Sequence, residues 1–486
     1  MQNDKNAKGG LHVSTRSFLT TVAILVALMV LAGVLTRVLP QGQYARTLDA
    51  NGNEIVVEGS YVLTPDAERL PVWRWFTAPV EMLGDAQALT AIVIIVFILL
   101  VGGAFSVLDR AGVFRYLIAA TIRRFGGRKY LLLCLISLLC MALGSTMGLL
   151  EETVPLVPLL VLLSLALGWD TLTGVGMSLL SVGFGFAAGT FNPFTVAVAQ
   201  KLAGVPLFSG LWLRLIVFVL IYALLCVFLV HHAKKVEKNP QVSYTFAQDE
   251  ARRSTLTASG NDEILANKAV GRAALAFVIA LGCVFGYVLL ALTIPGLSDY
   301  TMVVMALALP CGALIAGGIS RYNPKGMWKD FGSGVLSMAP GAVLILLSMS
   351  VRHIIEQGAI LDTLLHGAYT LLQGMTPFAA ILILYAIVLV FQFFVSSAAS
   401  KAFLIMPLIV PLADLIGLTR QSVVLAFCFG DGFTNVFFPT NAMLLIVLGM
   451  MDIPYTKWFK WTWKLQLVVL ILTALLLIFA VSVGYA

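Results

Sequence analysis

The sequence GSTMGLLEET, from Gly144 to Thr153, interrupts an apolar stretch that runs from Tyr130 to Gly168. Each remaining arm is about 15 residues long, whereas a helix needs about 20 residues to cross a bilayer. A re-entrant hairpin explains both the length and the interruption, because such a chain enters the membrane, turns near its centre and leaves on the same side. We therefore predict a re-entrant hairpin over residues 130–168.

The composition predicts an all-α polytopic membrane protein. Of the 486 residues, 60% are hydrophobic and only 11% are charged, and the apolar residues form long continuous runs. Inside lipid only helices and closed barrels satisfy the backbone polar groups, and continuous rather than alternating runs favour helices. All six cysteines lie inside apolar runs, so we expect neither disulfides nor a metal site built on them.

The distribution of charge predicts the orientation in a bacterial cytoplasmic membrane. Basic residues concentrate in the tail (1–17), in the segment 110–129 and at 231–238, where a polar cytoplasmic loop (234–268) begins, whereas the loop at 41–86 is acidic. The positive-inside rule therefore places the N-terminus in the cytoplasm and, after the expected number of crossings, the C-terminus outside. Because this pattern explains the net charge of +7, we expect a lipid bilayer and no nucleic acid as partners.

The second half of the chain repeats the plan of the first. A second hairpin is expected over 377–417, interrupted at SSAASK (396–401), and one overlong helix in each half is broken, at 189–193 and at 439–441. Short interfacial helices are expected at 112–125 and 356–372. In total we predict about nine full spans and two hairpins, divided into a first repeat (18–233) and a second repeat (269–486).

A shift of 249 residues brings the helix-breaking residues of the two halves into register. The matches are Pro158 with Pro407, Gly168 with Gly417, Gly183 with Gly432, Asn192 with Asn441 and Trp212 with Trp461. The first hairpin is expected to start from the cytoplasm and the second from outside, so the two repeats have inverted topology. Inverted repeats are the architecture of alternating-access transporters.

Polar side chains gather at the four interruptions, where unpaired backbone groups suit ions and substrates. Exposed carbonyls suit a cation such as Na⁺, and exposed N–H groups suit a carboxylate; alternatively, the small hydroxyl residues only ease helix packing. The candidate substrate- and ion-binding residues are Ser145, Thr146, Glu151, Glu152, Thr153, Thr190, Asn192, Pro193, Arg352, Ser396, Ser397, Ser400, Lys401, Asp431, Thr434, Asn435, Thr440 and Asn441.

Three of these candidates are charged in ways that leave several roles open. Glu151 and Glu152 are adjacent carboxylates that can carry a proton, bind a coupling cation, face a cationic substrate or simply be solvated in an aqueous vestibule. Lys401 is opposite Glu152 under the repeat shift, which suggests a buried ion pair between the two hairpin tips. It also suits a substrate carboxylate, or a position at the membrane surface.

Arg352 ends an apolar span, where it either lines the pathway or anchors the helix at the interface. Arg214, Asp414 and Arg420 lie near helix ends, and we expect structural roles for them.

Four segments resemble the YfcC family, a branch of the anaerobic C4-dicarboxylate carrier-like group within the ion transporter superfamily. They are LLEETVP (149–155), FNPFTVAVAQKLAGVPLFSG (191–210), MPLIVPLADLIGLTRQ (406–421) and FGDGFTNVFFPTNA (429–442). The resemblance implies an inverted-repeat transporter, often a homodimer, with elevator-like movement and with sites at hairpin tips and unwound helices. The second tip departs from the family, because Lys401 stands where a neutral amide is common.

The expected function is secondary active transport or antiport of a small carboxylate-bearing metabolite, either an amino acid such as arginine or ornithine or a C4-dicarboxylate. Coupling to Na⁺, H⁺ or exchange is expected, without a cofactor. The alternative is an intramembrane aspartyl protease, because FGDG at 429–432 resembles a Gly-x-Gly-Asp motif. Cys428 occupies the position of its first glycine, however, and no second suitable aspartate lies in an apolar span, so we do not expect an enzyme.

Overall fold

The computed structural model describes residues 15–48, 54–64, 69–84, 88–257, 261–291, 294, 300–395 and 397–486. Most of them are helical. The exceptions include two short antiparallel pairs, β1 (Gly42–Gln43) with β4 (Val62–Leu63) and β2 (Arg46–Leu48) with β3 (Glu54–Val56). The predicted class, an all-α polytopic membrane protein, is confirmed. Most of the predicted tail lies outside the described residues, and the first helix begins at Thr15.

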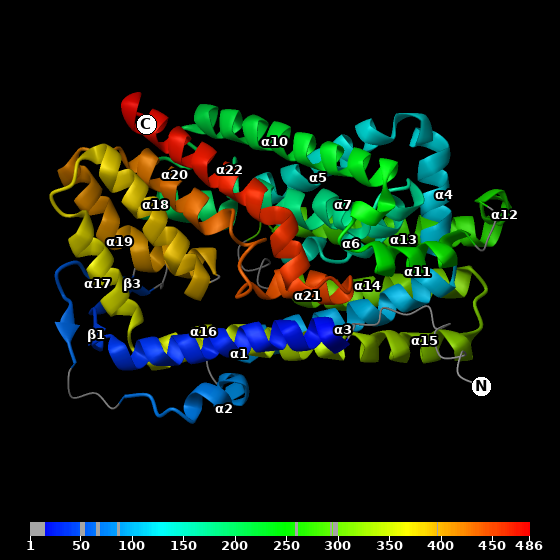
Figure 1. The fold of residues 1–486 in the computed structure, drawn as a ribbon, viewed down its shortest axis with the longest axis horizontal. Helices are drawn as coiled ribbons and strands as arrows, with labels where there is room; N and C mark the ends of the chain where they lie inside the picture. The colour runs from blue at the N-terminus through cyan, green and yellow to red at the C-terminus, as the bar shows by residue number, and fades with distance from the viewer. Residues whose placement is uncertain are drawn as a thin grey trace.

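One group of helices, which we call the α3 bundle, runs along one side of the molecule (Figure 1). Within it α3 packs against α14 and α15, α13 against α14, and α1 against α16. Its members are α1 (Thr15–Val38), α3 (Ala88–Arg110), α13 (Lys268–Ala291), α14 (Thr301–Ile319), α15 (Pro324–Ser337) and α16 (Ala339–Gln357).

The other group, the hairpin bundle, contains the interrupted helices, with α10 on the side opposite the α3 bundle (Figure 1). Its interrupted segments pack closely, α5 against α8 and α18 against α20. Its members are α5 (Lys129–Met147), η3 (Glu151–Thr153), α6 (Leu156–Ala166), α7 (Thr171–Val175), a π-helical turn (Gly176–Leu180), α8 (Ser181–Ala187), a second π-helical turn (Pro193–Ala197), α9 (Val198–Leu202), α10 (Leu211–Lys238), α18 (Pro377–Phe394), α19 (Ala398–Ile416), α20 (Arg420–Gly432), α21 (Ala442–Met450) and α22 (Tyr455–Ser482).

Shorter elements connect these helices. They are α2 (Arg74–Glu81), η1 (Met82–Gly84), α4 (Val113–Phe125), η2 (Gly126–Arg128), η6 (Pro240–Val242), α11 (Phe246–Thr257), α12 (Asn261–Ala266) and α17 (Leu361–Leu372). The segment predicted as a polar loop at 234–268 is therefore partly helical, because α10 continues to Lys238 and two further helices follow. The predicted interfacial helix at 356–372 begins five residues late, because α16 continues to Gln357.

The two arms of the first hairpin are unequal, contrary to the prediction. α5 continues through Gly144, Ser145 and Thr146 and ends only at Gly148, whose φ of 68° is a left-handed conformation that glycine adopts without strain. As a result α5 has 19 residues and α6 only 11. In the second hairpin α18 and α19 have 18 and 19 residues. The re-entrant course of both hairpins stays a prediction.

Nine helical segments of the described part are long and apolar enough to cross a membrane. Nine is also the predicted number of full spans, but the two sets differ. The segments selected by length and composition include α18, α19 and a joined α4–α5, whereas we predicted hairpin arms at α5, α18 and α19 and an interfacial helix at α4. They leave out α14 and both broken helices, which were predicted to cross.

Both predicted breaks are present, and they end in the same way. Asn192 and Asn441, which are 249 residues apart, each cap the helical turn that follows with a side-chain oxygen. Gly168 and Gly417, separated by the same interval, both have left-handed φ, 88° and 84°. The chain therefore repeats its helix starts and stops as well as its residue pattern.

The two halves also meet through matching residues. A Cβ added at Gly183 would lie 2.2 Å from Val436, and one added at Gly432 would lie 2.3 Å from Ala187. Val436 and Ala187 are themselves 249 residues apart, so the two contacts are reciprocal. Between them the rings of Phe184 and Phe433 meet edge to face at 5.6 Å. Reciprocal contact is the pattern that a local two-fold axis produces.

Candidate functional site

A buried ion pair joins the second hairpin to the second broken helix. Lys401 lies in the first turn of α19, just after the interruption that Ser397 caps, and Asp431 lies one residue before the end of α20. Lys401 Nζ is 2.6 Å from Asp431 Oδ1, and both side chains are 0% exposed. Within the described residues neither side chain has a regular hydrogen bond to support this contact. Burial of an ion pair without further hydrogen bonds has a high free-energy cost.

Three amide side chains form a hydrogen-bonded cluster that reaches the backbone of Asp431 through Asn435. Asn435 Nδ2 donates to the carbonyl of Asp431 at 3.1 Å, and Asn435 Oδ1 accepts hydrogen bonds from Gln392 Nε2 and, at 2.9 Å, from Asn441 Nδ2. These residues come from α18, from the unwound segment and from the cap of α21. The amides therefore hold the unwound segment 433–441 against the second hairpin.

This cluster retains unused hydrogen-bonding capacity. The hydroxyl of Thr434 and the side-chain oxygen of Gln392 are buried without a partner within the described residues. A buried polar atom without a partner costs about 1–3 kcal/mol, and such atoms are rare unless a ligand, ion or water meets them. The second break is thus a polar site whose donors and acceptors are not satisfied by the protein.

The first break is neutral and better satisfied. Ser145 Oγ donates to the carbonyl of Ala188 at 2.8 Å and accepts from the backbone N–H of Thr190 at 3.0 Å. Asn192 Oδ1 accepts from Phe194 N at 2.9 Å, and its Nδ2 donates to Phe186 O at 3.2 Å. Pro193 starts the helical turn after this cap. The first hairpin tip and the first break are thus joined by ordinary hydrogen bonds.

The acidic residues of the first tip do not reach Lys401. Glu152 accepts a hydrogen bond from the backbone N–H of Leu150 at 3.0 Å, and Thr153 Oγ1 donates to the carbonyl of Leu150 at 2.8 Å. The predicted pair between Glu152 and Lys401 is therefore wrong. The reason is that α19 packs against α20, which supplies Asp431 as a nearer partner. Glu151 and Glu152 are both partly exposed at the tip.

The remaining candidates are spread around the site. Arg352 Nε donates to Glu356 Oε1 at 2.7 Å on α16. The carbonyl of Thr440 accepts from Ser348 Oγ at 2.7 Å, a contact between the two bundles. Three others make local contacts or fall outside the description: Thr146 bonds to its own helix, Ser400 bonds to Ser397, and Ser396 lies outside the described residues.

Sequence reasoning missed Gln392 and Ser348. A signal for Gln392 was available, because it is the single amide side chain in the apolar helix α18, and an isolated polar residue at membrane depth marks a site. Ser348 gave no such signal, because serine in an apolar helix is common.

No group of three potential metal-ligating side chains occurs among the residues that the structure describes. Na⁺ at the hairpin tips stays a prediction.

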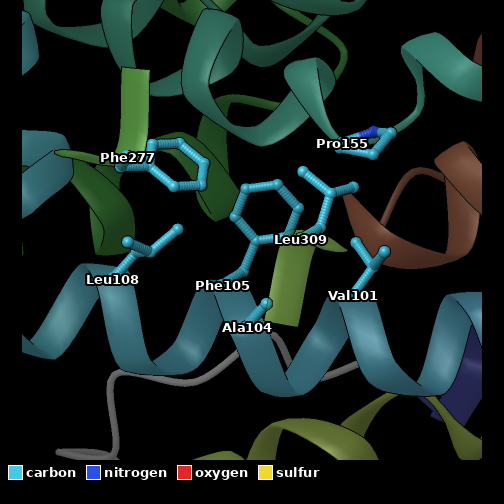
Figure 2. A pocket seen from close by; sticks show the side chains of 7 residues that line it. All are labelled: Val101, Ala104, Phe105, Leu108, Pro155, Phe277 and Leu309. Atoms are coloured by element: carbon cyan, nitrogen blue, oxygen red, sulfur yellow. The ribbon is translucent and has the colours of Figure 1, made fainter. Parts of the chain in front are cut away.

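A small cavity separates the two bundles near the first hairpin. Figure 2 shows Val101, Ala104, Phe105 and Leu108 of α3 facing Pro155 at the start of α6, with Phe277 and Leu309 beside them. The cavity volume is only about 10 Å³, and all its lining residues are apolar. A charged substrate has no partner there, so this cavity is not part of the polar site.

The fold and the polar site at its broken helices define the class, a multi-pass membrane transporter. The chain belongs to the C4-dicarboxylate anaerobic carrier family, whose model matches residues 18–482. The predicted resemblance is thereby confirmed, and the intramembrane protease alternative finds no support. The contacts at Asp431 agree, because a lysine rather than a second aspartate meets its carboxylate.

Two relatives match most of the chain. YfcC of Escherichia coli (strain K12), which carries the provisional name of a basic amino acid antiporter, is 31% identical over 406 residues, 82% of this chain and 79% of its own length. An uncharacterised protein of Haemophilus influenzae (strain ATCC 51907 / DSM 11121 / KW20 / Rd) is 27% identical over 96% of this chain and 98% of its own length.

Two solved transporter structures are more distantly similar. The Alcanivorax borkumensis YdaH transporter is 18% identical with a TM-score of 0.42, over 96% of this chain and 98% of its own. Neisseria gonorrhoeae MtrF, described as illuminating a class of antimetabolite efflux pumps, is 16% identical with a TM-score of 0.43, over 95% of each chain.

Proposed function

We propose that the protein is a secondary active transporter that moves a small carboxylate-bearing metabolite across the bacterial cytoplasmic membrane by alternating access. The observation that carries the proposal is the Lys401–Asp431 pair, because it is fully buried, lies between a hairpin tip and an unwound helix, and has no supporting hydrogen bonds. A substrate carboxylate can replace Asp431 as the partner of Lys401 at little net electrostatic cost.

The same exchange accounts for coupling. Once Lys401 binds a substrate carboxylate, Asp431 needs another positive partner in a site that excludes water. A proton or Na⁺ fills this role when the substrate is a dicarboxylate. The ammonium or side-chain cation of a basic amino acid fills it directly, which suits the antiport that the provisional name of YfcC describes.

The proposed architecture is a pair of inverted repeats with re-entrant hairpins. It is supported by the repeated helix starts and stops, and by the reciprocal contacts of Gly183 and Gly432. In this arrangement the N-terminus is cytoplasmic and the C-terminus external. A homodimer, which the family resemblance implies, is part of the same proposal.

Uptake by proteoliposomes tests the function. Wild-type protein should accumulate labelled arginine or labelled succinate, and Lys401→Met should reduce the initial rate by at least about 100-fold, because a lost bidentate or charge-assisted contact with a buried group is worth about 3 kcal/mol or more. Asp414→Asn is the matched control, since Asp414 also pairs with a cation, Arg420, but is 41% exposed. Uptake by Lys401→Met at the wild-type rate would refute the proposal.

A further inference from the structure

Arg214 is a buried cation without a counter-ion. Its residue exposure is 2%, and within the described residues no ion pair joins it to an acidic side chain. Only Nη2 has a hydrogen bond, to the carbonyl of Ser209 at 2.6 Å, whereas Nε and Nη1 are buried without a partner. A guanidinium carries its charge at any physiological pH, so burial in this state is strongly unfavourable.

The position of Arg214 in its helix increases this imbalance. α10 begins at Leu211, and Gly210 at its N-cap provides no side-chain hydrogen bond to the first backbone N–H groups. A helix N-terminus carries partial positive charge, so an arginine in the first turn is electrostatically disfavoured there. An uncapped helix start and an unpaired guanidinium together form the arrangement that binds an anion.

Arg214 lies where α10 meets the start of α20. Its hydrogen-bond partner Ser209 accepts, at its hydroxyl, a hydrogen bond from Gln421 Nε2 in the first turn of α20. Gln421 also accepts a hydrogen bond from Gln200 Nε2 at 3.2 Å, and Gln200 belongs to the segment after the first break. Asp431 lies ten residues further along α20, about 15 Å along the helix axis.

We propose that Arg214 and the N-terminus of α10 form a second carboxylate-binding subsite, at the start of α20 and separate from the Lys401–Asp431 pair near its end. The inference rests on the proposed function, because it assumes that the substrate carries a carboxylate. The subsite lies where the two halves of the chain meet, with α10 and Gln200 on one side and Gln421 of α20 on the other. A structural role alone leaves two guanidinium nitrogens and a permanent charge unexplained.

The contacts of Arg214 allow a clean substitution. The carbonyl of Ser209 also accepts a hydrogen bond from Gln200 Nε2 at 3.0 Å, so removal of the guanidinium leaves no new unpaired acceptor. Arg214→Met keeps an unbranched side chain but removes the charge and the N–H donors, and Arg214→Lys keeps the charge but not the fork of donors. Arg420→Met is the control, because Arg420 is 43% exposed and already paired with Asp414.

Thermal unfolding of purified full-length protein tests the subsite in two measurements. Without added carboxylate, Arg214→Met should unfold at the wild-type temperature or above it, because an uncompensated buried charge has been removed. With sodium succinate, against sodium chloride at equal ionic strength, the wild type and Arg420→Met should be stabilised, Arg214→Lys partly, and Arg214→Met at least about tenfold more weakly in apparent affinity.

The outcomes separate the two proposals. Equal stabilisation of Arg214→Met and wild type by succinate would overturn the subsite and leave the transport proposal intact. An unfolding temperature of ligand-free Arg214→Met well below that of Arg420→Met would also overturn it, because the guanidinium would then be structural. Stabilisation by chloride alone, equally at both arginines, would point to non-specific salt binding and against the subsite. A wild type that no carboxylate, including arginine, stabilises would contradict the proposed function itself.

Discussion

Two sets of buried carboxylates in this protein are built in opposite ways. Asp170, before α7, accepts hydrogen bonds from the backbone and hydroxyl of Thr173 (2.8 and 2.5 Å), from Ser243 Oγ (2.7 Å) and from His232 Nε2 (2.9 Å). Asp249, on α11, accepts from both groups of Thr171 and from Thr245. Asp431 is equally buried, yet a single ammonium group meets it.

The number of hydrogen bonds that each carboxylate accepts indicates its role. Around Asp170 the hydrogen bonds outweigh the opposing effect of burial, so its pKa lies below the usual range, with His232 as the main favourable partner. Such a saturated carboxylate stabilises the fold and has nothing left to bind. Asp431 has few partners for a buried charge, so we expect it to be costly to the fold unless a further partner meets it, as a substrate or ion would under the proposed function.

We call Asp170, Asp249 and their hydrogen-bond partners the saturated cluster. The helix α11, which carries Asp249, also connects the two broken helices. Arg252 on α11 donates to Thr171 Oγ1 at 2.9 Å, at the start of α7, and to the carbonyl of Met451 at 2.9 Å, just after α21. Arg253 donates to the carbonyl of Trp169. Segment 239–257, which appeared from sequence to be a plain linker, therefore fastens one end of each broken helix.

The largest expected effect on stability and transport comes from substituting one member of the Lys401–Asp431 pair, compared with substituting both. Lys401→Met alone leaves Asp431 as a buried unpaired charge and should destabilise the protein by about 3–5 kcal/mol, whereas Lys401→Met with Asp431→Leu should recover most of that loss. Transport should stay absent in both variants. Chemical unfolding and proteoliposome uptake measured together check this, and recovered uptake in the double variant would contradict the comparison.

Substitutions in the saturated cluster should have the opposite effect, a loss of stability without a loss of transport. Asp170→Asn and Asp249→Asn each break hydrogen bonds to buried donors, so each should lower the free energy of unfolding by about 2–3 kcal/mol. The protein that remains folded should transport at close to the wild-type rate. Uptake normalised to folded protein, measured by size-exclusion chromatography, is the test. A loss of transport at unchanged stability would contradict this prediction and show that the cluster is part of the transport site.

The pH dependence of stability follows from Asp170. Because its folded pKa is lower than the unfolded value of about 3.9, its contribution is fully present above that pH and disappears as pH falls through the folded pKa. The stability difference between wild type and Asp170→Asn should therefore be constant near neutrality and shrink below about pH 4. His232, Asp249 and Arg252 surround the group, so Asp249→Asn serves as a comparison in the same melting series. If the stability difference between wild type and Asp170→Asn did not change down to the most acidic pH, ionised Asp170 would not stabilise the fold in this way.

The smallest effect is expected at the neutral first break. Ser145→Ala removes a hydrogen bond to Ala188 and the acceptor for Thr190 N, and should cost about 1 kcal/mol of stability with a modest change in uptake. Thr146→Ala is the control, because Thr146 bonds only to the carbonyl of its own helix. If Ser145→Ala abolished uptake as completely as Lys401→Met, the contrast between the two breaks would be lost.

The sequence was most informative where local chemistry decides the structure. Glycine, proline and asparagine at the breaks predicted where helices stop, because each acts on its own backbone. The partner of Lys401 could not be predicted in this way, since it depends on how α19 is rotated against α20. The match of Glu152 with Lys401 by repeat register was a property of alignment, and it was overruled by the nearer Asp431.

Polar segments were hardest to interpret from composition. Residues 41–64 were expected to be a loop, yet they form two strand pairs, and Arg46 pairs with Asp362 at the start of α17 at 2.9 Å. Burial of Tyr44 in this contact, together with the nearby Asp362, raises its pKa to about 12. Such contacts join residues more than 300 positions apart, and charge and hydropathy patterns carry no information about them.

The reciprocal contacts of Gly183 and Gly432 determine where spectroscopic labels should be placed to detect movement of the helices. Neither Gly183 nor Gly432 has room for a methyl group against its neighbour, so α8 and the end of α20 are tightly packed. If the protein works by alternating access as proposed, we expect these two helices to move together, and spectroscopic labels on them to report a constant separation. Labels on α3 and on the segment around Pro155, which face each other across the small apolar cavity, should report a changing one.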